Sequence, residues 1–368
     1  MWDLKRPTYA LVGHDDDASA DIESKLQPHD SECVGLTSGI ALRTKPHFVR
    51  NWLRYTVLSA LLLCLVVLGA GMAYTSSRER YPPCVSPEKR IEWREMNRTE
   101  QQDYIAAVKC LQSFPAKLYP VGRLSDDFPW VHRHVARDIH NSALFLPYHR
   151  YFIHLYHKTL REHCRYHGTI PYWDWSRDWQ DPSKSPIWDP VTGFGGDGDP
   201  NGTVTIMWGS CIKEGPFVDY EVLWSDFYPR PHCLSRGFGR QPGAPWDNEF
   251  FKPHSMADLM SRDTFYDFTE TLEGGSHDAV PNGINGDFYT LESPNDPVFF
   301  LHHTNIDRLW WTWQRAKPGR MYEYNGPKTS WILNKGKLDD VMGMMGLGKD
   351  LRVRDVMDTE NGMMCYGY

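Results

Sequence analysis

The stretch DPVFFLHHTNIDRLWWTWQRA, residues 296–316, decides the fold of this chain. Asp296 is a favoured N-cap residue and Pro297 suits the first turn of a helix, so the stretch predicts a helix that begins here and continues to its end. His302 and His303 lie next to each other in this helix. Because consecutive helical residues point about 100° apart, one histidine of the pair faces away from whatever the other binds.

A second predicted helix carries another histidine. Pro147 suits its first turn, and HRYFIHLYHKTLREH continues with apolar residues at helical spacing. His149 is the third residue of this predicted helix. His132 and His140 precede it in the sequence, and the three histidines are spaced by eight and nine residues. Three neutral imidazoles can bind a divalent first-row metal ion.

The rest of the chain predicts one further helix and a long irregular region. Thr99 and Gln102 form a candidate capping box ahead of YIAAVKCL. Residues 174–254 are rich in Gly, Pro, Asp and Trp without a sustained period, so we expect long loops that wrap a helical core. Cys211 and Cys233 are available to pin them. The predicted fold class is therefore mainly α, as a single domain with loop-built walls.

Composition excludes one class of partner. The chain has 368 residues, a formal net charge of −7 and an aromatic content of 14%, which supplies enough large apolar surface for a sizeable core. It has no dominant block of Lys and Arg. Binding to nucleic-acid phosphates needs a concentrated basic face, so no nucleic-acid partner is expected.

Residues 55–77 predict a membrane anchor. The stretch has no charged residue and is long enough to cross the hydrocarbon core of a bilayer as a helix. It lies too far from the start to be a cleaved signal peptide, so we expect a signal anchor that stays attached. The preceding residues 1–54 include the acidic run DDDASADIES and few large apolar residues, which predicts a disordered cytosolic tail.

Two patterns place residues 78–368 in the lumen or outside the cell. Basic residues flank residues 55–77 equally on both sides and decide nothing. Asn97 and Asn201, however, begin glycosylation sequons, and six of the eight cysteines follow the anchor. Six cysteines can pair in 15 ways, and the sequence leaves that choice open. Nothing in the sequence predicts an oligomeric state.

Three motifs make the chain resemble the tyrosinase and hemocyanin-like family, in particular its membrane-anchored fungal branch from secondary-metabolite pathways. They are FLPYHRYF, PYWDW and SPNDPVFFLHHTNIDRLWW, and the resemblance covers roughly residues 84–368. It implies a four-helix core with two copper ions, each held by three histidines, that bind dioxygen between them. Matched residue by residue, it implies His132, His140 and His149 for the first metal and His277 and His303 for the second, with His302 behind the ligands.

One position departs from the family pattern. Four residues after His277 the family carries another histidine, but this chain has Pro281. Proline offers no ligand atom, lacks an N–H group and interrupts helices, so we expect the local helical geometry to be lost with the ligand. The first three-histidine site remains, which is the ligand set of a catalytic zinc with an open position.

These considerations predict a zinc enzyme similar to the cyclopenase-type members of the branch. Such enzymes open cyclopenin-type benzodiazepinediones without net redox change and give viridicatin-type quinolones, with loss of the methyl-isocyanate unit. The expected partner is thus a small aromatic alkaloid. His277 and His303 would bind a weaker second metal or serve as acid and base, with Asp278 orienting His277. Trp130, Tyr148 and Phe300 are candidates to stack on the substrate, or core residues.

Two alternatives stay open at this point. The first is a dicopper oxidase of phenols or peptide tyrosines, which five of the six family ligands favour and Pro281 disfavours. The second is a protein without enzymatic activity that kept the fold as a scaffold. The three histidines of the first site argue against the scaffold.

Overall fold

The structure is a computed structural model that describes residues 52, 54–67, 83–242, 246–360 and 362–368. The chain divides into two compact units, Met1–Arg80 and Tyr81–Tyr368. In the first unit the described residues 54–67 form a helix. No helix within the described ranges is both long and apolar enough to cross a bilayer. Residues 68–77 of the expected anchor and residues 1–51 of the expected tail lie outside those ranges, so both remain predictions.

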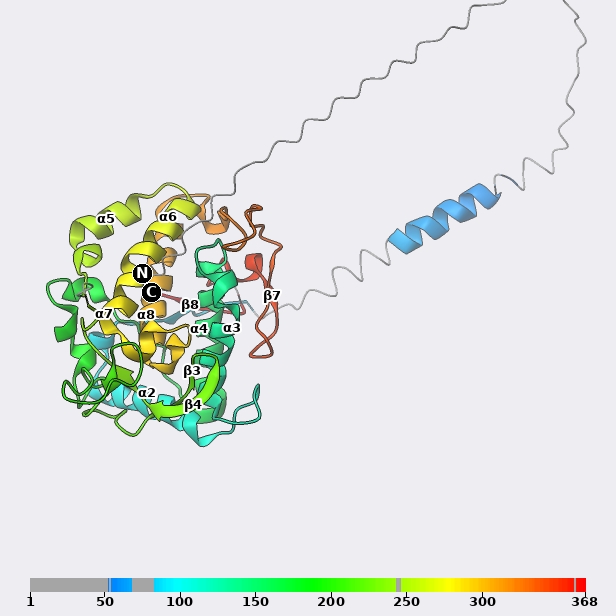
Figure 1. Ribbon diagram of the computed structural model, residues 1–368. Helices are drawn as coiled ribbons and strands as arrows, with labels where there is room; N and C mark the ends of the chain where they lie inside the picture. Colours follow the sequence, from blue (N-terminus) through cyan, green and yellow to red (C-terminus); the bar gives the residue numbers. More distant parts are fainter. Residues whose placement is uncertain (1–51, 53, 68–82, 243–245, 361) are drawn as a thin grey trace, which may run out of the picture. The chain divides into compact units, whose positions relative to one another are not determined.

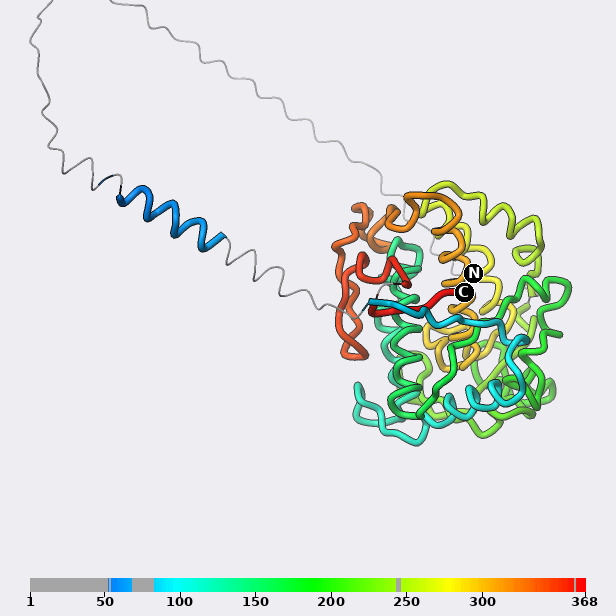
Figure 2. The backbone as a smooth tube through the Cα atoms, turned by 180° about the vertical axis from the view of Figure 1, so that it is seen from behind, coloured from blue at the N-terminus to red at the C-terminus, as the bar shows by residue number. Residues whose placement is uncertain are grey.

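The second unit is about half helical and is built around packed α-helices (Figures 1 and 2). Its helices are α2 (Arg98–Cys110), α3 (Asp127–Ile139), α4 (Phe145–Cys164), α5 (Pro253–Ser261), α6 (Phe265–Leu272), α7 (Asp278–Ile284) and α8 (Val298–Ala316). Four two-stranded sheets pair β1 (Glu88–Lys89) with β8 (Tyr366–Gly367), β2 (Ser210–Cys211) with β5 (Ser235–Arg236), β3 (Glu221–Ser225) with β4 (Tyr228–Cys233), and β6 (Val341–Met342) with β7 (Leu351–Arg352).

The starts of α4 and α8 largely follow the sequence. Helix α8 begins at Val298, so Pro297 takes the N-cap position that the sequence assigned to Asp296. The carboxylate of Asp296, one residue earlier, still accepts a hydrogen bond from the amide of Val298 at 3.0 Å. Helix α4 begins two residues earlier than expected, so Pro147 is its third residue. The first four amide groups of a helix have no partner inside it, so a proline at the third position breaks no hydrogen bond.

The capping box of α2 is formed by other residues than expected. Asn97 accepts a hydrogen bond from the amide of Glu100, and the carboxylate of Glu100 accepts one from the amide of Asn97. The prediction of Thr99 and Gln102 was therefore wrong by two residues. Asparagine is as good an N-cap as threonine, and glutamate at the third position completes the box as well as glutamine does.

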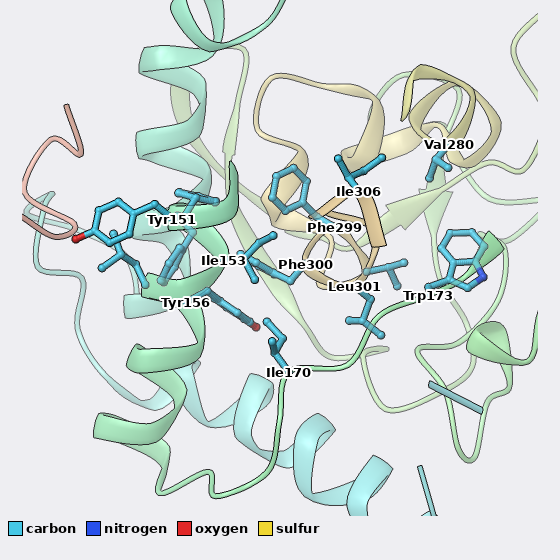
Figure 3. Packing of buried hydrophobic residues seen from close by; sticks show 14 of the residues in the cluster. Tyr151, Ile153, Tyr156, Ile170, Trp173, Val280, Phe299, Phe300, Leu301 and Ile306 are labelled. Carbon is cyan, nitrogen blue, oxygen red and sulfur yellow. The ribbon is translucent and has the colours of Figure 1, made fainter. Parts of the chain in front are cut away.

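Helices α4 and α8 form the centre of the hydrophobic core. The rings of Tyr156 from α4 and Phe300 from α8 are stacked with their centroids 3.4 Å apart. Figure 3 shows Ile153 and Tyr156 on one side of this contact and Phe299, Phe300 and Leu301 on the other. Large apolar side chains interlocked in this way hold the two helices at a fixed distance and angle.

Pro281 does not interrupt its helix, which corrects the sequence prediction. A π-helical segment, Glu273–His277, follows α6 and leads directly into α7. Pro281 is the fourth residue of α7, and its carbonyl accepts a hydrogen bond from Asn285 at 2.9 Å. An N–H at position 281 would donate to the carbonyl of His277, so the bond that proline cannot make falls where the π-helical segment passes into α7 and the hydrogen-bonding pattern changes.

The region 174–254 is less irregular than predicted. It contains several 3₁₀ turns and the hairpin β3–β4, which the sequence does not reveal because β4 reads YPRPHC and lies mostly exposed. Proline is tolerated in such an edge strand, where one side of the backbone needs no partner. The disulfide between Cys211 and Cys233 pins this region, as the sequence allowed.

Two further disulfides complete the pairing of the six cysteines after residue 77. Cys110 in α2 is joined to Cys164 at the end of α4. Cys84 is joined to Cys365 across 281 residues, beside the parallel pair β1–β8. The two ends of the second unit are thus linked covalently.

A buried ionic cluster connects α8 with α4 and with both ends of the second unit. The carboxylate of Asp307 contacts Arg90 at 3.1 Å and Arg150 at 2.5 Å, and it accepts hydrogen bonds from the hydroxyls of Tyr366 and Tyr368. Burial opposes the charge of Asp307, but the two guanidinium groups and the two hydroxyls lower its pKa below the ordinary value. The charges are paired and hydrogen-bonded, as buried charges must be.

Candidate metal centre

Three of the expected ligands, carried by α3 and α4, come together. His132 lies in α3, His140 caps the C-terminus of α3, and His149 lies in α4. One ring nitrogen from each lies within 4.8 Å of the others. Such a spacing allows all three nitrogens to reach one metal ion.

Backbone carbonyls orient two of these rings. Nδ1 of His132 lies 2.7 Å from the carbonyl oxygen of Leu291, and Nδ1 of His149 lies 2.8 Å from that of Phe145. A carbonyl can only accept, so each Nδ1 carries the proton and donates it. Each Nε2 then keeps its lone pair, and the two Nε2 atoms face each other at 3.3 Å.

Burial keeps these imidazoles neutral. It lowers the pKa of His132 to about 4 and the pKa values of His140 and His149 well below their ordinary value. Metal ions bind the neutral imidazole, so at neutral pH no proton has to leave before binding.

Glu273 supports His140 and was missed by the sequence analysis. Its carboxylate oxygen Oε1 accepts a hydrogen bond from the amide of Asn141 at 2.9 Å and lies 3.7 Å from Nδ1 of His140. Burial raises the pKa of Glu273 well above its ordinary value. A carboxylate one helical turn before His277 was the available signal, but only the fold shows that it faces His140.

The second group consists of His277, His302 and His303. His277 ends the π-helical segment, the other two lie in α8, and one ring nitrogen from each lies within 4.8 Å of the others. Nδ1 of His277 is 2.9 Å from the carboxylate of Asp278, the contact that the sequence suggested. This contact holds the Nδ1 proton and leaves Nε2 of His277 free.

The two groups lie against each other. The ring of His149 stacks on that of His303 with centroids 4.2 Å apart, and the rings of His140 and His277 are 5.7 Å apart. All five predicted ligands therefore gather in one buried centre. His140 is its most open member, with a side chain that is 23% exposed.

His302 is the residue whose place differs most from the sequence interpretation. Its ring centroid lies 5.3 Å from that of His277, and one of its nitrogens is within 4.8 Å of one nitrogen each of His277 and His303, close enough for a third ligand of the second group. Its Nδ1 accepts a hydrogen bond from the indole N–H of Trp175 at 3.2 Å, inside the core. Because indole only donates, the proton of neutral His302 must be on Nε2, which has no hydrogen-bond partner among the described residues.

The two groups of histidines differ in how readily they can bind a metal ion. Imidazole-only sites suit copper and zinc. The first group offers His132 and His149 with free Nε2 atoms, and Nε2 of His140 is buried without a partner in the described part of the chain, so it fits one ion. The second group has three imidazoles, but His302 must first move its proton from Nε2 and give up the Trp175 hydrogen bond.

Other candidates from the sequence lie elsewhere. Tyr148 and Phe300 are buried in the core, so they do not offer a free face to a substrate. Trp130 packs against His134, 4.4 Å between ring centroids, and is partly buried. Asn97 and Asn201 are exposed, as glycosylation acceptors have to be, and their modification stays a prediction.

The family comparison agrees with this architecture. The model of the common central domain of tyrosinase matches residues 102–316. The tyrosinase-like protein phomQ1' of Diaporthe leptostromiformis is 40% identical over 329 residues, covering 84% of this chain and 86% of its own. Tyrosinase ustQ of Aspergillus flavus is 37% identical, covering 89% of this chain and 92% of its own.

A solved structure supports the same assignment. A mutant of the polyphenol oxidase of Thermothelomyces thermophila superposes with a TM-score of 0.68 at 28% identity, over 83% of this chain and 94% of its own. The chain belongs to the tyrosinase family.

Proposed function

We propose that this protein oxidises phenolic substrates in fungal secondary metabolism at a dinuclear copper centre. The observation that carries the proposal is the second group of histidines, in which His302 joins His277 and His303. His302 would supply the imidazole that Pro281 cannot. The similarity to tyrosinases and to a polyphenol oxidase favours the same reaction class.

The proposal assigns a role to each residue of the centre. His132, His140 and His149 would hold one copper ion, and His277, His302 and His303 the other. Bound copper supplies the redox chemistry by which dioxygen accepts electrons from a phenol. Asp278 contacts Nδ1 of the His277 ring, and its carboxylate, 53% exposed, would accept the hydroxyl proton of an entering phenol.

Metal analysis combined with oxygen uptake tests the proposal. The full chain, loaded with copper, is expected to hold two ions, to show the dioxygen-dependent absorption of a coupled pair and to oxidise catechol. His302→Gln should lose one ion and reduce oxidation at least 100-fold, while His134→Gln, an exposed histidine outside the centre, should change neither. A single bound ion in the wild type without oxygen uptake would overturn the proposal.

A second candidate function rests on a different observation. Pro281 and the hydrogen bond from Trp175 to His302 both weaken the second group as a metal site. The first group alone would hold zinc with an open position, and the reaction would then be the cyclopenase-type opening of an aromatic alkaloid, with His277 and His303 as acid and base. One zinc per chain and turnover of cyclopenin without oxygen uptake would favour this candidate.

The location of the protein remains part of the proposal. We infer a single-pass membrane protein with residues 55–77 as its anchor and residues 78–368 in the lumen or outside the cell. Three disulfides in the second unit favour an oxidising compartment. Enzymatic deglycosylation, followed by a mobility shift that is lost in Asn97→Gln with Asn201→Gln, tests the orientation.

A further inference from the structure

A short hairpin on the second unit exposes an unusual set of apolar side chains. Residues 326–336 fold back on themselves through hydrogen bonds from the amide of Lys328 to Asn334 (2.8 Å) and from the amide of Gly336 to Gly326 (2.9 Å). Near its tip, Trp331 is 57%, Ile332 45% and Leu333 82% exposed. The orange segment that contains this 326–336 hairpin lies at the outside of the unit in Figures 1 and 2.

The tip is held in place by specific contacts. The hydroxyl of Ser330 donates to the carbonyl of Arg137 at 2.7 Å, and the indole N–H of Trp331 donates to the carboxylate of Asp138 at 3.0 Å. The amide of Ile332 donates to the hydroxyl of Thr329 at 3.0 Å. These bonds fix the backbone and satisfy the only polar atom of the Trp331 side chain, so the apolar groups are presented to the surroundings by an ordered turn.

Two lysines lie at the base of the hairpin, where Lys335 is opposite Pro327, and basic residues offset the nearby acidic groups. Lys335 and Lys337 are exposed, and neither ammonium group has a carboxylate partner in the described part of the chain. Asp340 pairs with Lys328 at 3.1 Å. Asp138 keeps its negative charge, and the neighbouring Arg137, whose guanidinium lies 5.7 Å from the centroid of the Trp331 ring, offsets it. The hairpin therefore presents an apolar tip, and the positive charges of Lys335 and Lys337 nearby have no carboxylate partner among the described residues.

We propose that the 326–336 hairpin docks on an anionic lipid bilayer, with Trp331, Ile332 and Leu333 entering its interfacial region. Aromatic and aliphatic side chains gain free energy at the boundary of headgroups and acyl chains, and lysines nearby are attracted to anionic headgroups. Three side chains are too small a surface for a stable protein interface, which needs several hundred Å² on each partner.

Docking would orient the metal centre toward the membrane. The amide of Ala143 donates to the carbonyl of Pro327 at 2.8 Å, so the hairpin is fastened to the turn that follows His140. His140 is the most open residue of the centre. An apolar aromatic substrate dissolved in the bilayer would then have a short path to it. This last step rests on the proposed function, whereas the docking itself does not.

A fluorescent probe at the tip tests the docking. In the full chain with Cys33→Ser and Cys64→Ser, Leu333→Cys is labelled with an environment-sensitive nitrobenzoxadiazole dye. The protein is placed in nanodiscs of phosphatidylcholine alone or mixed with phosphatidylserine. The same dye at Val204→Cys, a 62% exposed valine in another loop, is the matched control. We expect a blue shift at position 333 that grows with phosphatidylserine, and none at position 204.

The charge dependence provides a second measurement. Lys335→Gln and Lys337→Gln should each lower the partitioning of the probe into phosphatidylserine-containing nanodiscs roughly fivefold. Equal emission at positions 333 and 204 in every lipid would overturn the proposal. So would a shift at position 333 that appears without lipid and depends on protein concentration, since the partner would then be a second copy. Catalytic failure with an intact lipid-dependent shift would overturn only the proposed function.

Discussion

Trp175→Phe is expected to strengthen the binding of a second metal ion. The indole N–H of Trp175 donates to Nδ1 of His302 at 3.2 Å and so holds the imidazole proton on Nε2. For Nε2 to bind a metal ion, that proton must move to Nδ1, where it faces the indole N–H. Phenylalanine removes the opposing donor and the obstacle with it.

The magnitude follows from the hydrogen bonds involved. Moving the proton loses one buried hydrogen bond, about 1 kcal/mol net, and leaves donors buried and unpaired at about 1–3 kcal/mol. The total of about 2–4 kcal/mol weakens the second site roughly 30- to 700-fold. Trp175→Phe recovers only part of this, because Nδ1–H still lacks an acceptor. We therefore expect the affinity of the second copper ion to rise about 10- to 100-fold.

Equilibrium dialysis against copper buffers, with elemental analysis of the bound metal, measures this change. Trp173→Phe is the matched control, because Trp173 is equally buried but donates to Asp178 at 3.2 Å instead. Both substitutions leave a cavity and should lower the free energy of unfolding by about 1–3 kcal/mol. An unchanged or weaker second site in Trp175→Phe, relative to Trp173→Phe, would refute the reasoning about the His302 proton.

Three further predictions concern binding and stability. Pro281→His should raise the affinity for a second copper ion at least tenfold in the same dialysis, and it should change the free energy of unfolding by no more than about 1 kcal/mol, because the helical backbone at position 281 suits both residues and the added N–H can donate to the carbonyl of His277. Asp307→Asn should lower the free energy of unfolding in urea by about 3–5 kcal/mol, since two buried guanidinium groups lose their counter-charge, whereas Asp339→Asn at an exposed pair should cost under about 1 kcal/mol; similar losses would contradict this account. Burial lowers the pKa of His154 to about 4 and that of His157 to about 3, whereas both histidines have the ordinary pKa of 6.5 in the unfolded chain. Below pH 6.5 the unfolded chain therefore binds more protons than the folded one, and the free energy of unfolding should fall as the pH drops from 6.5 toward 3. His157→Gln should flatten that slope.

The sequence was most informative where the signals for a helix lie within that helix. The helices that carry His149 and His303 could be placed to within two residues, because helical spacing and proline positions are local signals. The resemblance to the tyrosinase family then supplied the five ligands. Their gathering in one centre agrees with that resemblance, although their binding of metal stays a proposal.

The sequence was least informative where distant segments meet. Trp175 and His302 are 127 residues apart, and nothing local in either segment indicates their hydrogen bond. Glu273 reaches His140 from a helix that follows it by more than a hundred residues. Pro281 was expected to break a helix because proline usually does so in a helix interior, whereas here it follows a π-helical segment whose different hydrogen-bonding pattern the local sequence does not indicate.

The bond between Cys84 and Cys365 has a mechanical consequence. When the chain is pulled between the segment ahead of residue 84 and its C-terminal residue, the force passes through this disulfide. The bond transmits the force directly from Cys84 to Cys365. The parallel pair β1–β8 beside it is loaded in shear. The helices that hold the histidines are bypassed. Tension on the tether should therefore leave the metal centre undistorted until the disulfide is reduced, which single-molecule stretching with and without a reductant can measure.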